Sequence, residues 1–301
     1  MTDSKNKLTL KTPSKINIFL KVTKKLPNGY HNIETIFLPL LEVFDTIDIS
    51  INSNKNTEQN ITVSCENNSV PNDSNNLCYK VAFAYFKQCD IKPDINIHIT
   101  KNIPVAAGMG GGSSDAAAVL KLLQNKYNIL TNSKLKGIAS KLGADIPYFL
   151  NPIPSIGHGI GDELQPINLS KKIHIVILAP LFPISAAWAY NNLKRKENSK
   201  VPYINKISNH LSSGNINKLS SELFNDLSFA AYKKFPILKI FKDELINAGA
   251  LNAEITGSGP TLFAICKDRK ISHKVANYIN LKYNDSVIKC FATICDSYSY
   301  S

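Results

Sequence analysis

The sequence lacks the features that mark several protein classes. Its six cysteines, at positions 65, 78, 89, 266, 290 and 295, include no C-x-x-C pair, so neither a disulfide framework nor a zinc site is expected. No apolar run is long enough for the hydrophobic region of a signal peptide near the N-terminus, or for a membrane span later in the chain. These absences predict a reduced, cytoplasmic protein that does not associate with membranes.

Acidic residues are also in the minority. The 301 residues include 23 Asp and Glu against 35 Lys and Arg, a formal net charge of +12. This excess suits an anionic partner, which could be nucleic acid, an acidic membrane surface or a phosphorylated small molecule. The length allows one large or two medium domains, and the 44% hydrophobic composition is that of an ordinary globular protein.

Helices and strands are predicted in an irregular order. Ile95, Ile97 and Ile99 alternate with polar residues, which indicates a half-buried strand. Further strands are expected over 61–65, 173–179, 261–266 and 287–295, and helices over 76–88, 114–124, 214–232 and 236–248. The order of elements favours an α+β fold. Proline and glycine punctuation over 147–166 predicts a boundary between a domain of residues 1–160 and a domain of residues 161–301.

The strand predicted over residues 14–22 carries two polar residues on one side. Ile16, Ile18 and Leu20 alternate with Lys15 and Asn17. Because successive side chains of a strand point to opposite faces, Lys15 and Asn17 are expected to point the same way.

A glycine-rich segment precedes one of the predicted helices. It contains four glycines in five positions, which free the backbone and remove side chains. The helix that follows presents unpaired N–H groups and the positive end of its dipole, so the segment predicts a phosphate-binding cradle. The simpler alternative is a glycine turn in which Ser113, Ser114 or Asp115 caps the helix. A cap needs one residue, and the excess of glycine therefore favours the cradle, made of Pro104, Val105, Ala106, Ala107, Gly108, Met109, Gly110, Gly111, Gly112, Ser113 and Ser114.

Two common phosphate-binding motifs do not fit this segment. A Walker A loop needs a lysine where Ser113 stands, and the dinucleotide fingerprint needs its third glycine at the same position. The pattern P-x-x-x-G-[LM]-G-G-G-S-S-x-A is instead similar to the ATP-binding motif of the GHMP kinases, with Met109 in place of the usual leucine.

Four further blocks follow the order of this family. Gly29-Tyr30-His31 resembles the opening of those GHMP kinases that phosphorylate a cytidine diphosphate-linked methylerythritol in non-mevalonate isoprenoid biosynthesis. The other blocks are 143–149, 225–227 and 256–260, and residues 151–154 and Ala186 depart from the pattern. The resemblance implies a two-domain fold, with an N-terminal ATP-binding domain, a C-terminal substrate domain and an active site in the cleft between them. It also implies ATP as phosphate donor and Mg²⁺, whose protein ligands the sequence does not assign.

The resemblance also implies roles for individual residues. Asp145 would be the general base for the C2 hydroxyl of the substrate, with Lys15 as its electrostatic partner. Tyr30 and His31 would bind cytosine, Asn17 would face the substrate, and Phe182 is a candidate for a second aromatic. Without the resemblance, Asp145 would be interpreted as a turn residue and Lys15 as a solvated lysine. Tyr30 and His31 would be interpreted as surface aromatics after a turn.

Two other functions remain open at this point. One is a GHMP kinase for homoserine, mevalonate or another small alcohol. The other is a basic RNA-binding protein, against which the lysines are scattered and no RNP-like or KH-like pattern occurs. We expect the cytidine diphosphate-linked small molecule and ATP as partners, no nucleic acid, no membrane, and a monomer or weak homodimer.

Overall fold

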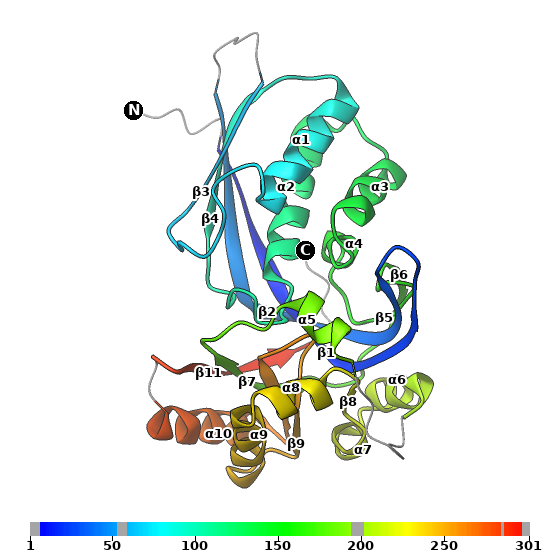
Figure 1. Ribbon diagram of the computed structural model, residues 1–301, viewed down its shortest axis with the longest axis vertical. Coiled ribbons are helices and arrows are strands. Elements are labelled where there is room, and N and C mark those ends of the chain that lie inside the picture. The colour runs from blue at the N-terminus through cyan, green and yellow to red at the C-terminus, as the bar shows by residue number, and fades with distance from the viewer. Residues whose placement is uncertain (1–6, 53–58, 194–201, 284–285, 297–301) are drawn as a thin grey trace. The chain divides into compact units, whose positions relative to one another are not determined.

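The computed structural model describes residues 7–52, 59–193, 202–283 and 286–296. They form two compact units (Figure 1). The first unit contains the described residues of Met1–Ser14, together with Val43–Val105 and Gly110–Pro152; the second contains Lys15–Glu42, Ala106–Met109 and the described residues of Ile153–Ser301. The chain passes between the units within strands β1 (Lys7–Lys25) and β2 (His31–Asn52), at the glycine-rich segment, and within the atypical residues 151–154.

The first unit consists of a sheet and four helices. Strand β4 (Asp94–Thr100) pairs in parallel with β3 (Asn60–Cys65) and antiparallel with residues 46–52 of β2. The helices are α1 (Leu77–Cys89), α2 (Gly111–Tyr127), α3 (Asn132–Leu142) and α4 (Ile146–Leu150). In Figure 1, α1 and α2 lie along one face of β3 and β4. The predicted alternation in β4 is confirmed, since Ile95, Ile97 and Ile99 are buried.

Helix α2 is buried along most of its length. Residues 114–120 and Leu122–Leu123 are shielded from solvent, because α2 packs against both α1 and α4. The position of its first turn is therefore fixed by its neighbours.

The second unit has a four-stranded antiparallel sheet in the order β11 (Ile288–Cys295), β7 (Ile173–Pro180), β10 (Leu262–Cys266) and β9 (Asn252–Ile255). Helices α9 (Ile237–Asn247) and α10 (Arg269–Lys282) pack on this sheet. Val176 and Leu178 face the resulting core, while Ile175 and Ile177 are buried as well. Strand β7, which the sequence predicted over 173–179, therefore buries apolar side chains on both faces.

The remaining elements of the second unit surround the other parts of β1 and β2. Residues 19–20 of β1 pair in parallel with β8 (Phe224–Asn225). Residues 35–37 of β2 pair with β5 (Ser155–His158), which pairs with β6 (Glu163–Pro166). The other helices are α5 (Ala186–Asn191), α6 (Ile204–Ser213), α7 (Ile216–Ser221) and α8 (Ser228–Lys234). The prediction of a single helix over 214–232 was wrong, because strand β8 lies between helices α7 and α8.

The mixture of helices and antiparallel strands confirms the predicted α+β class. All six cysteines are free thiols, and only Cys89 is not fully buried.

Candidate active site

The helix that follows the glycine-rich segment begins at glycine. The N-cap of α2 is Gly110, whose backbone is left-handed with φ 75°, and no side chain of the described residues caps it. The predicted start at Ser114 was three residues late, so Ser113, Ser114 and Asp115 lie inside the helix and none is its cap. Because the N–H groups of a first helical turn have no acceptor within the helix, an uncapped glycine start is suited to bind phosphate.

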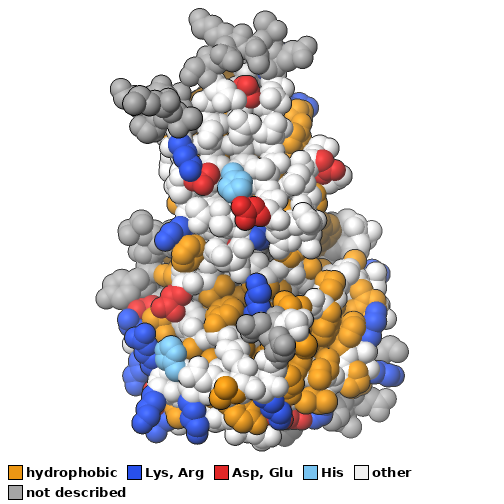
Figure 2. Space-filling model, turned by 90° about the vertical axis from the view of Figure 1, so that its left-hand side faces the viewer, with side chains coloured by type: hydrophobic (Ala, Val, Ile, Leu, Met, Phe, Trp, Pro, Cys, Tyr) orange, Lys and Arg blue, Asp and Glu red, His pale blue; other side chains and the backbone are white. Residues whose placement is uncertain are grey.

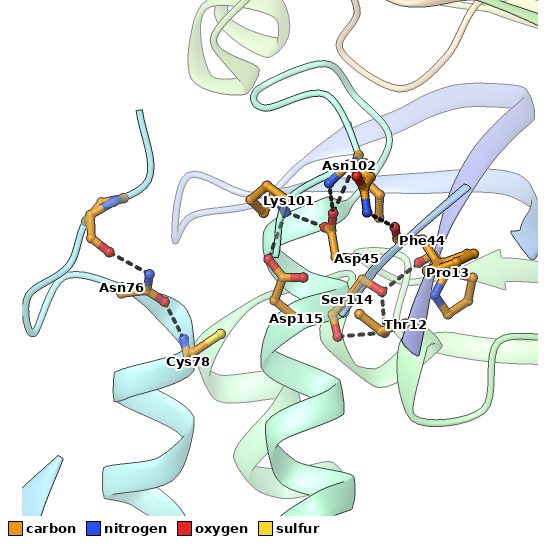
Figure 3. Close-up of polar contacts among 12 residues, drawn as sticks. Thr12, Pro13, Phe44, Asp45, Asn76, Cys78, Lys101, Asn102, Ser114 and Asp115 are labelled. Carbon is orange, nitrogen blue, oxygen red and sulfur yellow. Dashed lines mark hydrogen bonds and ion pairs between the residues drawn. The ribbon is translucent and has the colours of Figure 1, made fainter. Parts of the chain in front are cut away.

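Ser114 fastens this first turn to β1 within the first unit. Its hydroxyl donates a hydrogen bond to the Pro13 carbonyl oxygen over 2.6 Å, and the Thr12 hydroxyl donates to the Ser114 carbonyl oxygen over 3.0 Å. Figure 3 shows the two contacts side by side. Both hydroxyl-bearing side chains are buried. The serine that could have capped the helix therefore anchors it instead.

A buried cluster of three charges lies beside this turn (Figure 3). Lys101 Nζ is 2.5 Å from Asp45 Oδ2 and 2.8 Å from Asp115 Oδ2, and the three side chains are at most 5% exposed. Burial raises the pKa of Asp115, although Lys101 acts in the opposite direction. Burial alone would lower the pKa of Lys101, but Asp115 and Asp45 together raise it. The lysine is therefore an ammonium ion held by two carboxyl groups.

The middle of the glycine-rich segment belongs to the second unit, where it lies against residues 256–260. Gly108 has a left-handed backbone with φ 77°, and a Cβ atom there would be closer than 3.0 Å to the Thr256 carbonyl oxygen. The Met109 carbonyl oxygen accepts the backbone N–H of Lys15 over 3.1 Å. Ala106 also has positive φ, at 52°, a conformation that costs free energy in a residue with a side chain. Position 108 therefore requires glycine, because its backbone is in close contact with residues 256–260.

Lys15 and Asn17 point the same way, as their spacing predicted, but the side of the strand they occupy is buried. Lys15 is 4% exposed and Asn17 is 2% exposed, so the interpretation of Lys15 as a solvated lysine was wrong. Lys15 Nζ donates to Asn17 Oδ1 over 2.6 Å and to the Gly108 carbonyl oxygen over 3.2 Å. Asn17 Nδ2 donates to the hydroxyl of Thr35, at 2.7 Å. These bonds fix the ammonium group of Lys15 beside Gly108 of the glycine-rich segment.

Residues 225–227 form hydrogen bonds to two other segments of the second unit. Asn225 Nδ2 donates to the carbonyl oxygens of Ile255 and Gly257, both at 2.8 Å. Asp226 Oδ2 accepts the backbone N–H of Val22 over 2.7 Å. The block thus connects the loop at 256–260 with the strand that carries Lys15.

Asp145 lies in the first unit, at the N-cap position of α4. Its side chain makes no capping hydrogen bond to that helix. The alternative in which Asp145 is a helix cap therefore lacks the hydrogen bond that defines a cap.

An aromatic pair in the second unit includes one residue that the sequence did not single out. The His31 ring stacks on Tyr190 of α5, with centroids 5.1 Å apart and planes 22° apart. Burial, and then the charge of Lys25, lowers the pKa of His31. Tyr30 is 52% exposed. Phe182, the candidate for a second aromatic, stacks on Phe235. No sequence motif distinguishes Tyr190 from the other aromatic residues around it.

Within the described ranges, no group of three or more His, Cys, Asp or Glu side chains could hold a metal ion. None of the helices in the same ranges is long and apolar enough to cross a membrane.

Known proteins resemble this chain over nearly its whole length. The model of the GHMP kinases N terminal domain matches residues 76–151, and that of the GHMP kinases C terminal domain matches residues 208–285. A Clostridium perfringens protein named 4-diphosphocytidyl-2-C-methyl-D-erythritol kinase is 34% identical over 288 residues, which are 95% of this chain and 98% of that protein. The chain belongs to the GHMP kinases, in the family of the 4-diphosphocytidyl-2-C-methyl-D-erythritol kinases. Membership in the GHMP kinases implies a phosphotransferase whose phosphate donor is ATP.

Solved structures of GHMP kinases have the same fold. A crystal structure of 4-(cytidine 5'-diphospho)-2C-methyl-D-erythritol kinase matches with a TM-score of 0.79 and 25% identity, covering 95% of this chain and 98% of the other. A homoserine kinase from Cytophaga hutchinsonii matches with a TM-score of 0.76 at 15% identity, covering 99% and 96%. The second likeness is one of fold alone, so it does not favour homoserine as a substrate.

Proposed function

We propose that this GHMP kinase transfers the γ-phosphoryl group of ATP to the C2 hydroxyl of 4-diphosphocytidyl-2-C-methyl-D-erythritol, giving the 2-phosphate and ADP in non-mevalonate isoprenoid biosynthesis. The observation that carries the proposal is the uncapped glycine start of α2, in a chain that also contains the block Gly29-Tyr30-His31 and is 34% identical over 288 residues to a protein of that name.

The ATP phosphates bind the segment Pro104–Ser114 through backbone N–H groups. Three features support this role: the uncapped helix start at Gly110, the absence of side chains at the glycines, and the close packing of Gly108 against Thr256. Such a site holds negatively charged oxygens with donors that need no rearrangement, which is the main requirement of phosphoryl transfer.

Asp145 accepts the proton of the C2 hydroxyl while that oxygen attacks the γ-phosphorus and the bond to the bridging oxygen of ADP breaks. Lys15 stabilises the charge of the transferred group. The fixed, buried ammonium of Lys15 and the place of Asp145 in the sequence block 143–149 support these assignments. Asn17 positions Lys15, and an amide that makes one bond from each end keeps one N–H and one lone pair for the substrate.

Tyr30 and His31 bind the cytosine. The pair supplies a stacking surface and a hydrogen-bonding edge, and the stacked Tyr190 ring holds the His31 ring in place. The lowered pKa of His31 favours its neutral form at pH 7, in which one ring nitrogen donates and the other accepts.

Magnesium accompanies ATP, held chiefly by phosphate oxygens and water, as is common for this ion. We further propose a cytoplasmic enzyme of two sequence domains, residues 1–160 and 161–301, which acts as a monomer or weak homodimer and binds no nucleic acid. On the face drawn in Figure 2, Lys and Arg side chains stand in several separate groups between hydrophobic and uncharged side chains.

The decisive experiment is phosphate transfer by the purified chain with ATP and Mg²⁺. ADP is expected to form with 4-diphosphocytidyl-methylerythritol and not with homoserine or mevalonate. Transfer to either free alcohol, or none to the cytidine-linked substrate, would contradict the proposal. A rise in melting temperature with RNA and none with ATP would favour the RNA-binding alternative.

A further inference from the structure

The charged cluster of Lys101, Asp45 and Asp115 touches both ends of the ATP segment. Asp45 Oδ1 accepts the backbone N–H groups of Asn102, over 2.6 Å, and Ile103, over 2.8 Å. These are the two residues that precede Pro104, where the segment begins. At the other end, Asp115 lies in the helix directly after Ser114 and binds Lys101. The cluster therefore joins the two ends of the segment through a single ammonium group.

Lys101 also lies close to the first helical residue. A Cβ atom at Gly111 would be 3.0 Å from Lys101 Nζ. The ammonium is thus packed under the start of α2, yet it is too buried and too fully bonded to its two carboxylates to act as a phosphate ligand itself.

Packing alone does not explain the cluster. It places two carboxyl groups against one ammonium in an apolar interior, and Asp115 Oδ1 makes no hydrogen bond to any residue that the structure describes. A buried carboxylate with an unsatisfied oxygen lowers stability. Such an arrangement is expected where a position is needed for function more than for stability.

We propose that Asp45 and Asp115, acting through Lys101, are positioning residues for ATP: they set the distance between the two ends of the phosphate-binding segment. This inference rests on the proposed function, because it assigns a purpose to the segment that binds ATP. None of the three residues of the cluster is among those proposed to bind the cytidine-linked substrate, so the effect should be confined to the nucleotide.

The test compares two buried aspartates of the first unit. In Asp115→Asn, the side chain keeps its size and an acceptor for Lys101 but loses its charge. Asp94→Asn is the matched control, since Asp94 is also buried, lies at the opposite end of the strand that leads to Lys101, and binds Asn60. ATP affinity is measured by calorimetry, and KM for each substrate and kcat by steady-state phosphate transfer, with melting temperatures alongside.

Asp115→Asn is expected to raise the ATP Kd and KM about 10-fold, the usual effect of losing one charge-assisted hydrogen bond. The KM for the cytidine-linked substrate should stay within about twofold, as expected for an independent site. The melting temperature should be unchanged or higher, because an unsatisfied buried charge is removed. Asp94→Asn should leave the ATP Kd unchanged.

A double mutant tests whether Asp115 acts through Lys101. In a Lys101→Met background, which should itself bind ATP weakly, Asp115→Asn should have little further effect on the ATP Kd. If Lys101→Met does not fold, the comparison of Asp115→Asn with Asp94→Asn decides alone.

An unchanged ATP Kd in Asp115→Asn would overturn the inference, as would an equal loss of affinity for both substrates accompanied by a fall in melting temperature. If the unmodified chain binds ATP but transfers no phosphate to the cytidine-linked substrate, the proposed function fails while the Kd comparison still tests the cluster. A chain that binds no ATP contradicts both.

Discussion

Replacing Gly108 by alanine should separate the geometry of the phosphate loop from the overall stability of the protein. The new methyl group would stand closer than 3.0 Å to the Thr256 carbonyl oxygen and 3.0 Å from the Gly259 nitrogen, while ordinary contacts begin near 3.4 Å. Both neighbours are backbone atoms and cannot rotate away. The loop at 106–109 must therefore move relative to the loop at 256–260.

The size of the effect follows from two contributions. Alanine in the left-handed conformation costs about 1–2 kcal/mol, and overpacking in a tight site costs about 1–3 kcal/mol. Loss of freedom in the unfolded chain returns about 0.4–1 kcal/mol, so the free energy of unfolding should fall by about 1–5 kcal/mol. A misplacement of about 1 Å can reduce turnover about 100-fold, so kcat/KM for ATP should fall by that order.

Two other glycines serve for comparison. The control is Gly137→Ala, which lies outside the phosphate-binding segment and introduces a methyl group with nothing within 4 Å. Gly112→Ala places a methyl group inside the segment, where it meets only Leu77 at 3.9 Å. Gly137→Ala should raise stability slightly, since alanine favours a helix more than glycine does. Steady-state kinetics and thermal unfolding of the three variants decide the matter. If Gly108→Ala had the same kcat/KM for ATP as Gly137→Ala, the contact between residues 106–109 and 256–260 would not position the phosphates.

Three further outcomes are expected. Tyr30→Ala should lower the affinity for the cytidine-linked substrate about 5-fold to 150-fold, since stacking a base on an aromatic ring contributes about 1–3 kcal/mol. The affinity for ATP should be unchanged. Tyr190→Leu should lower the affinity for the same substrate, because the His31 ring loses its stacking partner. The pKa of His31 is lowered from 6.5, so His31 is neutral at pH 7 and becomes charged as the pH falls through the lowered pKa. The KM for the cytidine-linked substrate should therefore rise below about pH 6.5. In His31→Gln, the KM should stay level over the same pH range. Asp145→Asn should keep both ligands but lose about 100-fold to 10,000-fold in single-turnover rate, and combining it with Lys15→Ala should add little to the poorer single variant.

Each of these predictions has an opposing result. Equal losses for ATP and the cytidine-linked substrate in Tyr30→Ala would indicate a structural role for that ring. A KM that rises equally at low pH in His31→Gln would assign the pH dependence to another group. Additive rate losses in the double variant would separate Lys15 from Asp145.

The sequence predicted the positions of several strands and helices because their apolar periodicity is local, but β2, α3 and α10 were not predicted. The strands at β4 and β7 and the helix α1 needed only a few neighbouring residues to be identified. The start of α2 was missed because capping statistics favour Ser and Asp over Gly. Here Ser114 and Asp115 bind Pro13 and Lys101 instead, and local statistics contain no information on those partners.

The surroundings of the site depended on contacts between distant segments. Alternation along β1 suggested that Lys15 faces solvent, but the glycine loop and Thr35 cover that side. The charged cluster joins Asp45, Lys101 and Asp115. The sequence singled out only Asp115, and only as a possible helix cap. Tyr190 approaches His31 only through the folding of the second unit.

The division of the chain between the two units also determines when each can fold during synthesis. The first 152 residues contain every segment of the first unit, so that unit can form while the ribosome is still at work. Residues 15–42 must wait longer, because Asn17 donates to Thr256, 239 positions later in the chain, and Phe19 pairs with Phe224. Until then Leu20 and Val22, which share a buried core with Val176 and Leu262 in the finished protein, remain uncovered and available to a chaperone. Asn17 is thus made long before Thr256, the residue to which its backbone N–H donates.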